Sequence, residues 1–454
     1  PYVTRVLHPA NLGKVTFAQS VVSYFALIAS LGVSTYAVRE GSKLRGNKRF
    51  DQFCNEIFTT NMITTALAYA LTIAAIVCIP QLRSYSALIL LLSISMIFTT
   101  IGVDWINVIF EDFLFLTIRS IVVQVANLIL LFLLVKNEND YYIYAFLTVL
   151  ANIIVGMWNF VYCKKYVKVK IIKHSNFGLH IKPMLIFFAN NVAISIYCYA
   201  DTTMLGLMKG ESSVGIYSVA VKAYTVVKTV LAAVYTVCIP RLSSYYGTGE
   251  KHRFIELSNT IMSCLLLILI PAMTGLFVLA GPIILFLGGA EYVVAIPTLR
   301  ILSIALIFAI LGGVLSSCVN IPTGKEKISL IGTIVAATLN VGLNFILIPL
   351  FSQNGAALTT AIAELSVLII CCFANKEIKV IYDWKNLFKN IITAGIGSLS
   401  VVISYWVTKQ LIKDILLLCI ATILTSVLLY VLILIISKNK YLVKILEIFK
   451  GKFN

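Results

Sequence analysis

The stretch VGIYSVAVKAYTVVKTVLAAVYTVCI, residues 214–239, is a long apolar run with a lysine, Lys228, near its middle. It exceeds the about 20 residues that an α-helix needs to cross the hydrocarbon core of a bilayer. A charge at mid-span costs roughly 2.5–3.5 kcal/mol or more in lipid, so it is tolerated only where it faces a polar cavity. The stretch therefore predicts a membrane-spanning helix in a protein that handles a polar cargo.

Twelve further stretches have the same apolar character, and the composition agrees with them. Hydrophobic residues make up 60% of the chain and charged residues 12%, against about 45–50% and 25% in soluble domains. We predict an all-α polytopic membrane protein with thirteen visible spans. They lie near residues 15–38, 55–79, 85–110, 114–135, 141–163, 183–208, 214–239, 255–287, 293–320, 328–350, 354–374, 388–407 and 415–436.

Two places in this pattern depart from a simple row of helices. The stretch 255–287 is unusually long and contains Pro271 and Gly275, which predicts a kink or a broken helix. The chain starts at Pro1 on what reads as the end of an earlier element. We therefore expect a first span to be missing, which would give fourteen in the full protein.

Lysines and arginines are concentrated in alternate connections. Of the 36 basic residues, 26 fall in one set of segments, seven in the other set, and three inside spans. Basic residues near span ends favour the cytoplasm, so the richer set, including residues 164–182, is predicted to be cytoplasmic. The net charge of +17 would suggest nucleic acid in a soluble protein. Here topology and attraction to anionic membrane lipid explain it, and no nucleic acid is predicted as a partner.

The sequence shows an internal duplication. Residues 13–42 resemble residues 215–244, with Arg39 and Arg241 both 26 positions after the first glycine. Transporters commonly arise from such repeats, with the substrate site between the halves. The predicted parts are an N-terminal lobe, a cytoplasmic linker, a C-terminal lobe, an additional two-helix hairpin and a basic cytoplasmic tail, at residues 1–163, 164–182, 183–374, 375–436 and 437–454.

Signals for catalysis or for a metal site are missing from the sequence. The ten cysteines are scattered without metal or disulfide spacing, and all four histidines are placed in connecting segments. The chain has no Walker-type loop, no Ser/His/Asp or Cys/His arrangement and no paired carboxylates on a loop. We predict that the protein is not an enzyme and uses no metal or cofactor.

Helical periodicity gathers polar residues of the 214–239 span on one face. By that periodicity, Tyr217, Tyr224, Lys228 and Tyr235 fall within about 20° of one line. Tyrosine rings pack against sugar faces and an ammonium meets an anion, so this stripe is a candidate site for a sugar phosphate. The alternative is a pair of interfacial tyrosine positions with a lysine that snorkels. The mid-span position of Lys228 favours the cavity.

Other spans also carry polar stripes, for which hydrogen bonding between helices is the alternative explanation. That alternative explains the asparagines and threonines well and the aspartates less well. Asp104 and Asp201 lie at mid-span without a sequence-local basic partner, and Glu364 follows Thr360 by one turn. These three carboxylates are candidates for binding a coupling proton or cation. The stripes comprise Asn190, Tyr197 and Asp201 in the span 183–208, and Thr100, Asp104 and Asn107 in the span 85–110.

Several arginines lie at or near predicted span ends, where cytoplasmic anchoring and substrate contact are equally open. Arg5 is the exception, because it lies on the side that is poor in basic residues and needs another reason to be there. Arg5, Lys222 and Arg300 are further candidates for binding an anionic cargo. The arginines near span ends are Arg5, Arg39, Arg119, Arg241 and Arg300.

Several motifs carry a family resemblance. The opening reads PYVTRVLHPANLG, followed by FAQSVVSYFALIASLGVSTYAVRE, and the second half contains ADTTMLG, GIYSVAVKAY, IPRLSSYY, IPTGKEKISLIGTIVAATLNVGLNFILIP and NGAALTTAIAE. Over about residues 1–375 the chain resembles the polysaccharide flippases of the multidrug/oligosaccharidyl-lipid/polysaccharide exporter superfamily. In that family a glycine usually stands at the position of His8, and many relatives have a lysine at the position of Thr202.

The resemblance implies both a fold and a task. The fold is two six-helix lobes in a V around a central cavity, plus a C-terminal helix pair. The task is to move undecaprenyl-diphosphate-linked oligosaccharide from the cytoplasmic to the outer leaflet of the bacterial inner membrane by alternating access. The product would be a surface polysaccharide such as O-antigen or capsule, with a polymerase and glycosyltransferases of the same pathway as partners.

Two alternative functions stay open. A cation-coupled multidrug exporter of the same superfamily would favour acidic residues in its cavity, whereas this chain offers Lys228, Lys222 and Arg5. A membrane-embedded polysaccharide polymerase would want a large extracytoplasmic loop carrying arginines, and the sequence shows none.

Overall fold

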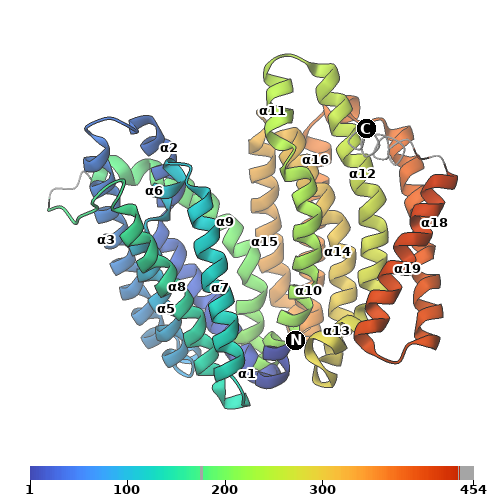
Figure 1. Cartoon of the computed structure of the whole chain (residues 1–454), viewed down its shortest axis with the longest axis horizontal. Coiled ribbons are helices and arrows are strands. Elements are labelled where there is room, and N and C mark those ends of the chain that lie inside the picture. Colours follow the sequence, from blue (N-terminus) through green and yellow to red (C-terminus); the bar gives the residue numbers. More distant parts are fainter. Residues whose placement is uncertain (174–176, 438, 440–454) are drawn as a thin grey trace. The chain divides into compact units, whose positions relative to one another are not determined.

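The computed structural model describes residues 1–173, 177–437 and 439, and over this part the chain is helical without a β-strand (Figure 1). Twelve helical segments of the described chain are long and apolar enough to cross a membrane. A bent helix, His180–Ala189 followed by Ile194–Lys209, brings the number to thirteen. The prediction of an all-α polytopic protein with thirteen visible spans is confirmed. The predicted basic tail lies almost wholly outside the described residues.

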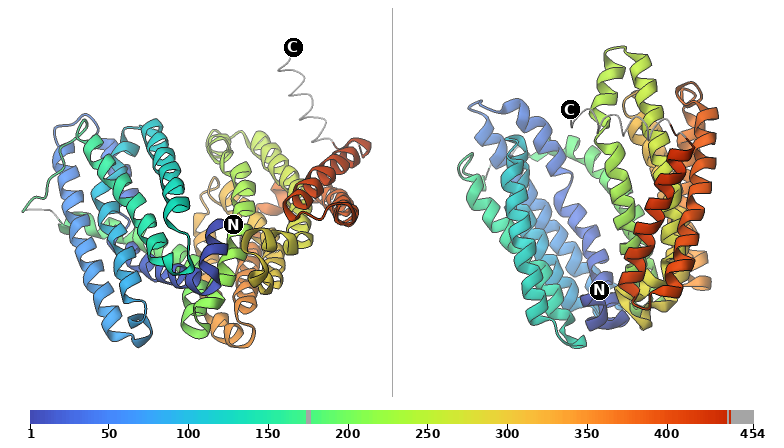
Figure 2. Two further views of the ribbon diagram at one scale, coloured as in Figure 1. Left: turned by 60° about the horizontal axis from the view of Figure 1, so that its bottom comes forward. Right: turned by 45° about the vertical axis from the view of Figure 1, so that its right-hand side comes forward.

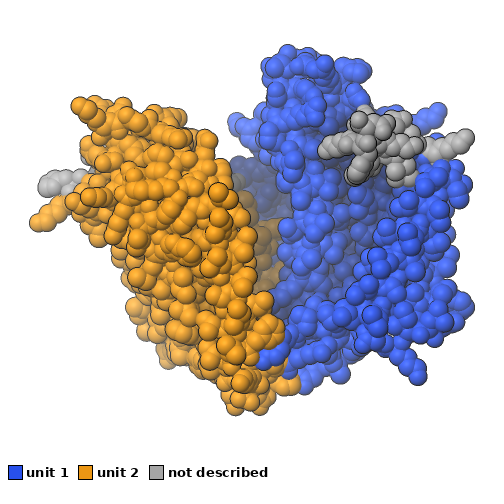
Figure 3. All heavy atoms as spheres, viewed as in Figure 1, with its two compact units in different colours: residues 1–5, 216–454 blue, residues 6–215 orange. Residues whose placement is uncertain are grey.

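The helices form two compact units, which Figure 3 colours separately. Unit 2 comprises residues 6–215, and unit 1 comprises residues 1–5 and 216–454. This division differs from the predicted one, because the boundary does not fall in the lysine-rich linker. Helix α9 (Phe177–Lys209) groups with the helices before it, and the C-terminal helix pair belongs to unit 1.

Several helices of unit 2 break at residues with positive φ. One break is at His8 (φ 59°), inside the first helix, in a conformation that favours glycine. That explains the glycine which the family resemblance places at this position. In chain order the elements are α1 (Tyr2–Ser30), α2 (Val33–Leu44), α3 (Phe50–Cys78), α4 (Pro80–Arg83), α5 (Ser86–Gly102), α6 (Asp104–Ile109), α7 (Phe113–Leu134), η1 (Glu138–Asp140), α8 (Tyr141–Cys163) and α9.

Unit 1 contains the remaining helices, from α10 onward. In chain order the elements are α10 (Glu211–Thr236), α11 (Ile239–Gly247), α12 (Lys251–Val278), α13 (Ala280–Gly288), η2 (Ala290–Ala295), α14 (Ile296–Val314), the π-helical turn η3 (Leu315–Asn320), α15 (Glu326–Phe351), α16 (Gln353–Ala374), α17 (Ile378–Ile381), α18 (Trp384–Leu411) and α19 (Ile415–Ile436).

The break expected near Pro271 falls later, at Leu279, because a membrane helix tolerates an internal proline.

The last two helices, α18 and α19, run side by side and pack onto α12 (Figures 1 and 2). The Tyr430 hydroxyl donates a hydrogen bond of 2.7 Å to the carbonyl oxygen of Leu267 on α12. Gly397 on α18 leaves room for the Tyr430 ring, since a Cβ there would lie 1.9 Å from a ring carbon. The C-terminal helix pair is thus fixed to unit 1 by specific contacts.

The two glycines that begin the duplicated segments lie where α1 and α10 meet within unit 2. A Cβ on Gly13 would lie 1.7 Å from the backbone oxygen of Glu211, and a Cβ on Gly215 would lie 1.9 Å from that of Pro9. Any side chain at either position would collide with the backbone of the other helix. The start of α10 can therefore cross α1 closely only because both positions are glycine.

Candidate functional site

The polar stripe of α10 carries a buried ion pair. Lys228 Nζ lies 2.6 Å from Oε1 of Glu364 on α16, and the side chains are 33% and 8% exposed respectively. The Lys228 ammonium also lies 5.5 Å from the centroid of the Tyr224 ring. Two residues that the sequence suggested for separate tasks, anion binding and ion coupling, are thus direct partners inside unit 1.

The three tyrosines of this stripe are buried between helices in this conformation. The Tyr217 hydroxyl lies 3.5 Å from Oγ1 of Thr360 on α16. The Tyr235 hydroxyl fills the space beside Gly313 of α14, where a Cβ would lie 2.4 Å from it. The stripe therefore faces α14 and α16, and Lys228 is its most exposed member. The tyrosines are Tyr217, Tyr224 and Tyr235, exposed by 3%, 5% and 9%.

The other cations suggested for anion binding lie in different surroundings. Arg5 donates hydrogen bonds of 3.0 and 3.5 Å to two backbone carbonyl oxygens in the last turn of α13, where helix carbonyls lack partners and favour a cation. This capping contact supplies a structural reason for Arg5. The Arg300 guanidinium lies 5.4 Å from the centroid of the Phe277 ring. Lys222 is exposed on α10, six positions before Lys228 and therefore on another face.

The stripe predicted for the 183–208 span belongs to α9 of unit 2. Asp201 is 5% exposed and lies within electrostatic reach of Tyr24 on α1. Tyr197 is partly buried, whereas the side chain of Asn190 lies outside the described part of the structure. Because unit 2 ends before Lys228, the structure groups these residues in a different unit from that lysine.

Asp104 has a basic partner on the next long helix, which the sequence did not reveal. Arg119 of α7 donates from its two terminal nitrogens to Oδ1 and Oδ2 of Asp104, at 3.0 and 3.1 Å. The Arg119 side chain is 3% exposed and that of Asp104 is 53% exposed. The turn between α6 and α7 brings these two positions together. Arg119 is therefore paired with Asp104 rather than a free cation.

A helix break divides the other predicted stripe. Helix α5 ends just before Val103, whose φ of 44° and ψ of 41° are left-handed, and α6 starts just after it. Beyond the break, the buried Asn107 donates to Asn159 of α8, while Thr100 hydrogen-bonds to α3. The stripe is therefore divided: Thr100 and Asp104 both line one cavity, whereas Asn107 contacts α8.

A polar cavity of about 310 Å³ lies beside this break, wholly within unit 2. It is surrounded by α1, α2, α3, α5, α6 and α8. The sequence analysis singled out two of its residues and missed the rest, because hydroxyl and amide groups scattered over five helices form no local pattern. Its polar and aromatic lining includes Ser30, Ser34, Asn61, Ser95, Thr99, Thr100, Asp104, Trp105 and Asn152.

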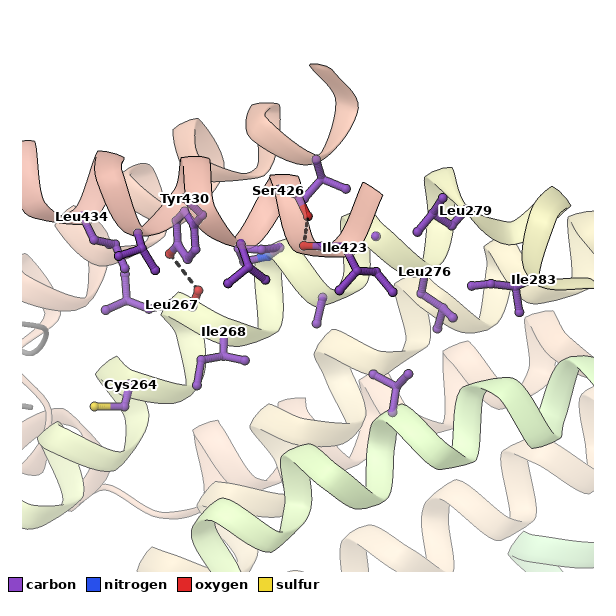
Figure 4. A pocket seen from close by; sticks show the side chains of 17 residues that line it. Cys264, Leu267, Ile268, Leu276, Leu279, Ile283, Ile423, Ser426, Tyr430 and Leu434 are labelled. Atoms are coloured by element: carbon purple, nitrogen blue, oxygen red, sulfur yellow. Dashed lines mark hydrogen bonds between the residues drawn. The ribbon is translucent and has the colours of Figure 1, made fainter. Parts of the chain in front are cut away.

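A larger cavity, of about 530 Å³, lies in unit 1 among α12, α13, α18 and α19 (Figure 4). Its lining is almost entirely aliphatic. The hydroxyls of Tyr430 and Ser426 are hydrogen-bonded to backbone carbonyl oxygens. This surface can accept a hydrocarbon chain without stranding a polar group.

His180 is a further residue whose position the sequence did not reveal. It was placed in a connecting segment, whereas α9 already begins at Phe177 and the His180 side chain is buried. Its Nδ1 lies 3.0 Å from the Tyr36 hydroxyl and its Nε2 lies 2.9 Å from Oε2 of Glu56. Among the described residues, no group of three or more His, Cys, Asp or Glu side chains is arranged to hold a metal ion.

Comparison with known proteins places the chain in a family. The family model described as "Polysaccharide biosynthesis protein" matches residues 1–246, and the one described as "MatE" matches residues 187–346. A protein of Shigella dysenteriae named "Putative O-antigen transporter" is 22% identical over 389 residues, covering 84% of this chain and 94% of that protein. Lipid II flippase MurJ of Bacillus subtilis is 23% identical over 233 residues, 48% of this chain and 42% of that protein.

Solved structures show the same fold. Lipid II flippase MurJ in an inward closed conformation superposes with a TM-score of 0.79 at 17% identity, over 96% of this chain and 95% of that chain. An inward-facing multidrug resistance MATE family transporter of the MOP superfamily gives 0.57 at 15% identity, over 82% and 94%. These relatives are transporters and flippases rather than enzymes, which agrees with the sequence analysis. The resemblance noted in the sequence is confirmed, and the chain belongs to the polysaccharide biosynthesis protein family of multi-pass membrane proteins.

Proposed function

We propose that this protein is a flippase that moves undecaprenyl-diphosphate-linked oligosaccharide units from the cytoplasmic to the outer leaflet of the bacterial inner membrane. The observation that carries the proposal is Lys228, a cation at mid-span whose partner, Glu364, reaches it from another helix. A charge at this depth is costly and marks a path for a polar or charged cargo. A diphosphate bearing sugars is such a cargo, because it cannot cross hydrocarbon unaided.

The pair suggests how the anion is received. In this conformation the Lys228 ammonium donates a hydrogen bond to the Glu364 carboxylate. A proton on Glu364 removes that negative charge, and the ammonium is then available to a phosphate. Loss of the proton restores the pair and expels the phosphate. In this scheme Glu364 couples proton binding to cargo binding, while alternating access exposes the site to each side of the membrane in turn.

The aliphatic cavity of unit 1 supports a lipid-linked cargo. Its lining lies mainly on α12 and α19, with single residues from α10, α13 and α18 (Figure 4). The prenyl chain of a carrier lipid already lies in hydrocarbon, so entry into this cavity needs no loss of apolar surroundings, and the chain meets almost no polar atom there. We propose that the chain of the carrier lipid rests here while the head group crosses.

The relatives support the same class of cargo. Those covering most of the chain carry the name of an O-antigen transporter, and MurJ is named for lipid II. The lysine-rich connections favour a loading side in the cytoplasm. We propose that glycosyltransferases supply the cargo on that side, and that a polymerase of the same pathway uses it on the other.

One observation favours a second candidate function. The "MatE" model matches residues 187–346, and that region holds most of α9 to α15. A multidrug exporter would carry organic cations, which the positive Lys228 repels once Glu364 is neutral. The lipid-linked oligosaccharide is therefore the preferred cargo.

A complementation experiment tests the proposal. The protein is expressed in a strain that lacks its own repeat-unit flippase, and surface polysaccharide is measured together with the lipid-linked oligosaccharide left on the cytoplasmic leaflet. The same strain is challenged with cationic drugs. Restored polysaccharide without drug resistance supports the flippase. Drug resistance without restored polysaccharide, from protein that is inserted in the membrane, would refute it.

A further inference from the structure

We propose that the polar cavity of unit 2 is a saccharide-binding site, in which the Asp104 carboxylate accepts hydrogen bonds from hydroxyl groups of one sugar of the cargo. This inference rests on the proposed function and adds which part of the cargo unit 2 recognises. The cavity volume of about 310 Å³ lies at the lower end of the range for small-molecule pockets, about 300–1,000 Å³.

The carboxylate is held in place for this task. Arg119 donates one hydrogen bond to each carboxylate oxygen of Asp104, at 3.0 and 3.1 Å, and so uses one acceptor position on each. An ionised carboxylate has about four acceptor positions, so the two oxygens retain capacity on the other side. The Asp104 side chain is 53% exposed and lines the cavity, whereas Arg119 is 3% exposed. The buried Arg119 guanidinium thus orients the accessible Asp104 carboxylate. A carboxylate held in this way can accept hydrogen bonds from two neighbouring hydroxyls of a sugar ring.

The rest of the lining offers the groups that a sugar needs. Serine, threonine and asparagine side chains from α1, α2, α3, α5 and α8 surround the carboxylate. Hydroxyls both donate and accept, and amides do each at separate atoms. Trp105 contributes an aromatic wall beside Asp104. Donors, acceptors and one ring around a single carboxylate match a polyhydroxyl ligand.

The backbone at the cavity is strained. Val103 has φ 44°, a conformation that is a genuine outlier for a β-branched residue and costs of the order of 1–3 kcal/mol. It joins α5 to α6 between Gly102 and Asp104, which both line the cavity. Discontinuous membrane helices commonly form substrate sites. The strained backbone at Val103 fixes the position of Asp104. A binding role for Asp104 in turn accounts for the presence of this strain.

Charge distinguishes a sugar from other ligands at this place. The Asp104–Arg119 pair is neutral overall, so it attracts neither a diphosphate nor a bare cation strongly. Among the described residues no second carboxylate lines this cavity, so a cation would find one charged ligand that arginine already engages. A neutral sugar gains two directed hydrogen bonds without a change in net charge.

Tryptophan fluorescence provides the test. Replacing Trp158, Trp384 and Trp406 by phenylalanine leaves Trp105 as the sole tryptophan of these 454 residues. The purified protein is titrated with the monosaccharides obtained by hydrolysis of the source organism's surface polysaccharide. At least one of them should give a saturable change. Asp104→Asn should weaken that binding by about tenfold or more, the effect of losing a charged hydrogen-bond partner.

The matched control is Asp112→Asn, which removes another ion-paired aspartate of unit 2, outside the cavity lining, and should leave sugar binding unchanged. A response to sodium chloride or sodium pyrophosphate in place of the sugars would overturn the proposal, as would equal binding by Asp104→Asn. No saturable change with any sugar would overturn it too. If the complementation experiment still restores polysaccharide, that result refutes the sugar site alone and leaves the flippase proposal standing.

Discussion

The Lys228 ammonium and the Glu364 carboxylate lie 2.6 Å apart, although 136 positions separate them in the chain. Each side chain neutralises the other in the interior of unit 1. Removing one partner of a buried pair leaves an uncompensated charge, which typically costs about 3–5 kcal/mol. From the sequence alone, loss of Lys228 would be expected to spare the fold. Because Glu364 would be left unpaired, we now expect loss of Lys228 to destabilise the protein.

Single and double variants of this pair should separate stability from transport. Lys228→Ala and Glu364→Ala should each lower the melting temperature of the purified protein and abolish export. The double variant should recover most of the stability but no export, because neither charge is stranded and the anion site is gone. Lys228→Arg should retain part of the export, since the charge survives while the point-like ammonium geometry does not.

The pair of Lys325 and Glu377, 2.7 Å apart in the same unit, is the matched control. Its side chains are 34% and 41% exposed, so Lys325→Ala should change stability by less than about 1 kcal/mol and leave export intact. Export at the wild-type level by stable Lys228→Ala protein would show that this lysine is no anion site. The site would then have to be sought at Arg5, Lys222 or Arg300.

Most of the fold could be predicted from apolar run lengths and basic connections, since a membrane imposes both. The positions of the breaks could not. Gly102 precedes Val103, and Gly281 and Pro282 follow Leu279 closely. Glycine and proline also occur inside continuous membrane helices, as Pro271 does in α12, so they did not fix where each helix ends. One asparagine of α15 does join two helices, because Asn344 accepts a hydrogen bond from Thr359 of α16.

The candidate sites were predictable residue by residue but not pair by pair. Periodicity placed Lys228 and Glu364 on polar faces, yet it holds no information about which helices face each other. Asp104 and Arg119 are only 15 positions apart, but they meet across a turn rather than along one helix. The position of His180 inside a helix could not be predicted, because α9 begins several residues before its hydrophobic run.

The crossing of α1 and α10 should depend on its two glycines. Gly13→Ala places a Cβ 1.7 Å from a backbone oxygen, and relieving that clash moves the helices apart at a cost of about 1–3 kcal/mol. Gly342→Ala in α15 is the control, because nothing lies within 4 Å of the new Cβ. Thermal unfolding in detergent should show a lower melting temperature for Gly13→Ala only. Equal melting temperatures would contradict the close crossing.

The predicted topology can be checked with single cysteines in a cysteine-free protein. A cysteine at Lys136 should react with a membrane-impermeant maleimide in intact cells, because its connection is poor in basic residues. A cysteine at Lys168, in the lysine-rich segment, should react only after the membrane is permeabilised. Labelling of position 168 from outside in intact cells would reverse the orientation and with it the proposed direction of transport.

Acid should weaken a contact at the start of α7. Oδ2 of Asp112 accepts hydrogen bonds from the Tyr166 hydroxyl, Lys165 Nζ and the Tyr162 hydroxyl at 2.6, 2.9 and 2.7 Å. These bonds hold the pKa of Asp112 well below its usual range. A carboxyl with a lowered pKa in the folded state stabilises the fold above its unfolded pKa, about 3.9, and loses this contribution as the pH falls toward the folded pKa.

Asp112→Asn should therefore lower the melting temperature at pH 7, and the gap to wild type should narrow below about pH 4. Asp51→Asn, at the exposed start of α3, should lower the melting temperature at pH 7 by less, because this variant loses only a favourable charge at a helix end. A gap for Asp112→Asn that is constant from pH 7 to pH 3 would show that the ionised carboxylate contributes nothing to stability.

His180 should hold α9 to α3 through Glu56. The two side chains are 4% and 7% exposed and their polar atoms lie 2.9 Å apart, so His180→Ala leaves the Glu56 carboxylate without its ring partner. This should destabilise the protein more than Tyr36→Phe, which removes one hydrogen bond worth about 1 kcal/mol. Adding Glu56→Gln to His180→Ala should restore part of the loss, because the amide carries no charge to strand. Thermal unfolding of the three variants measures this order, and a double variant less stable than His180→Ala would show that Glu56 is stabilised by groups other than the imidazole.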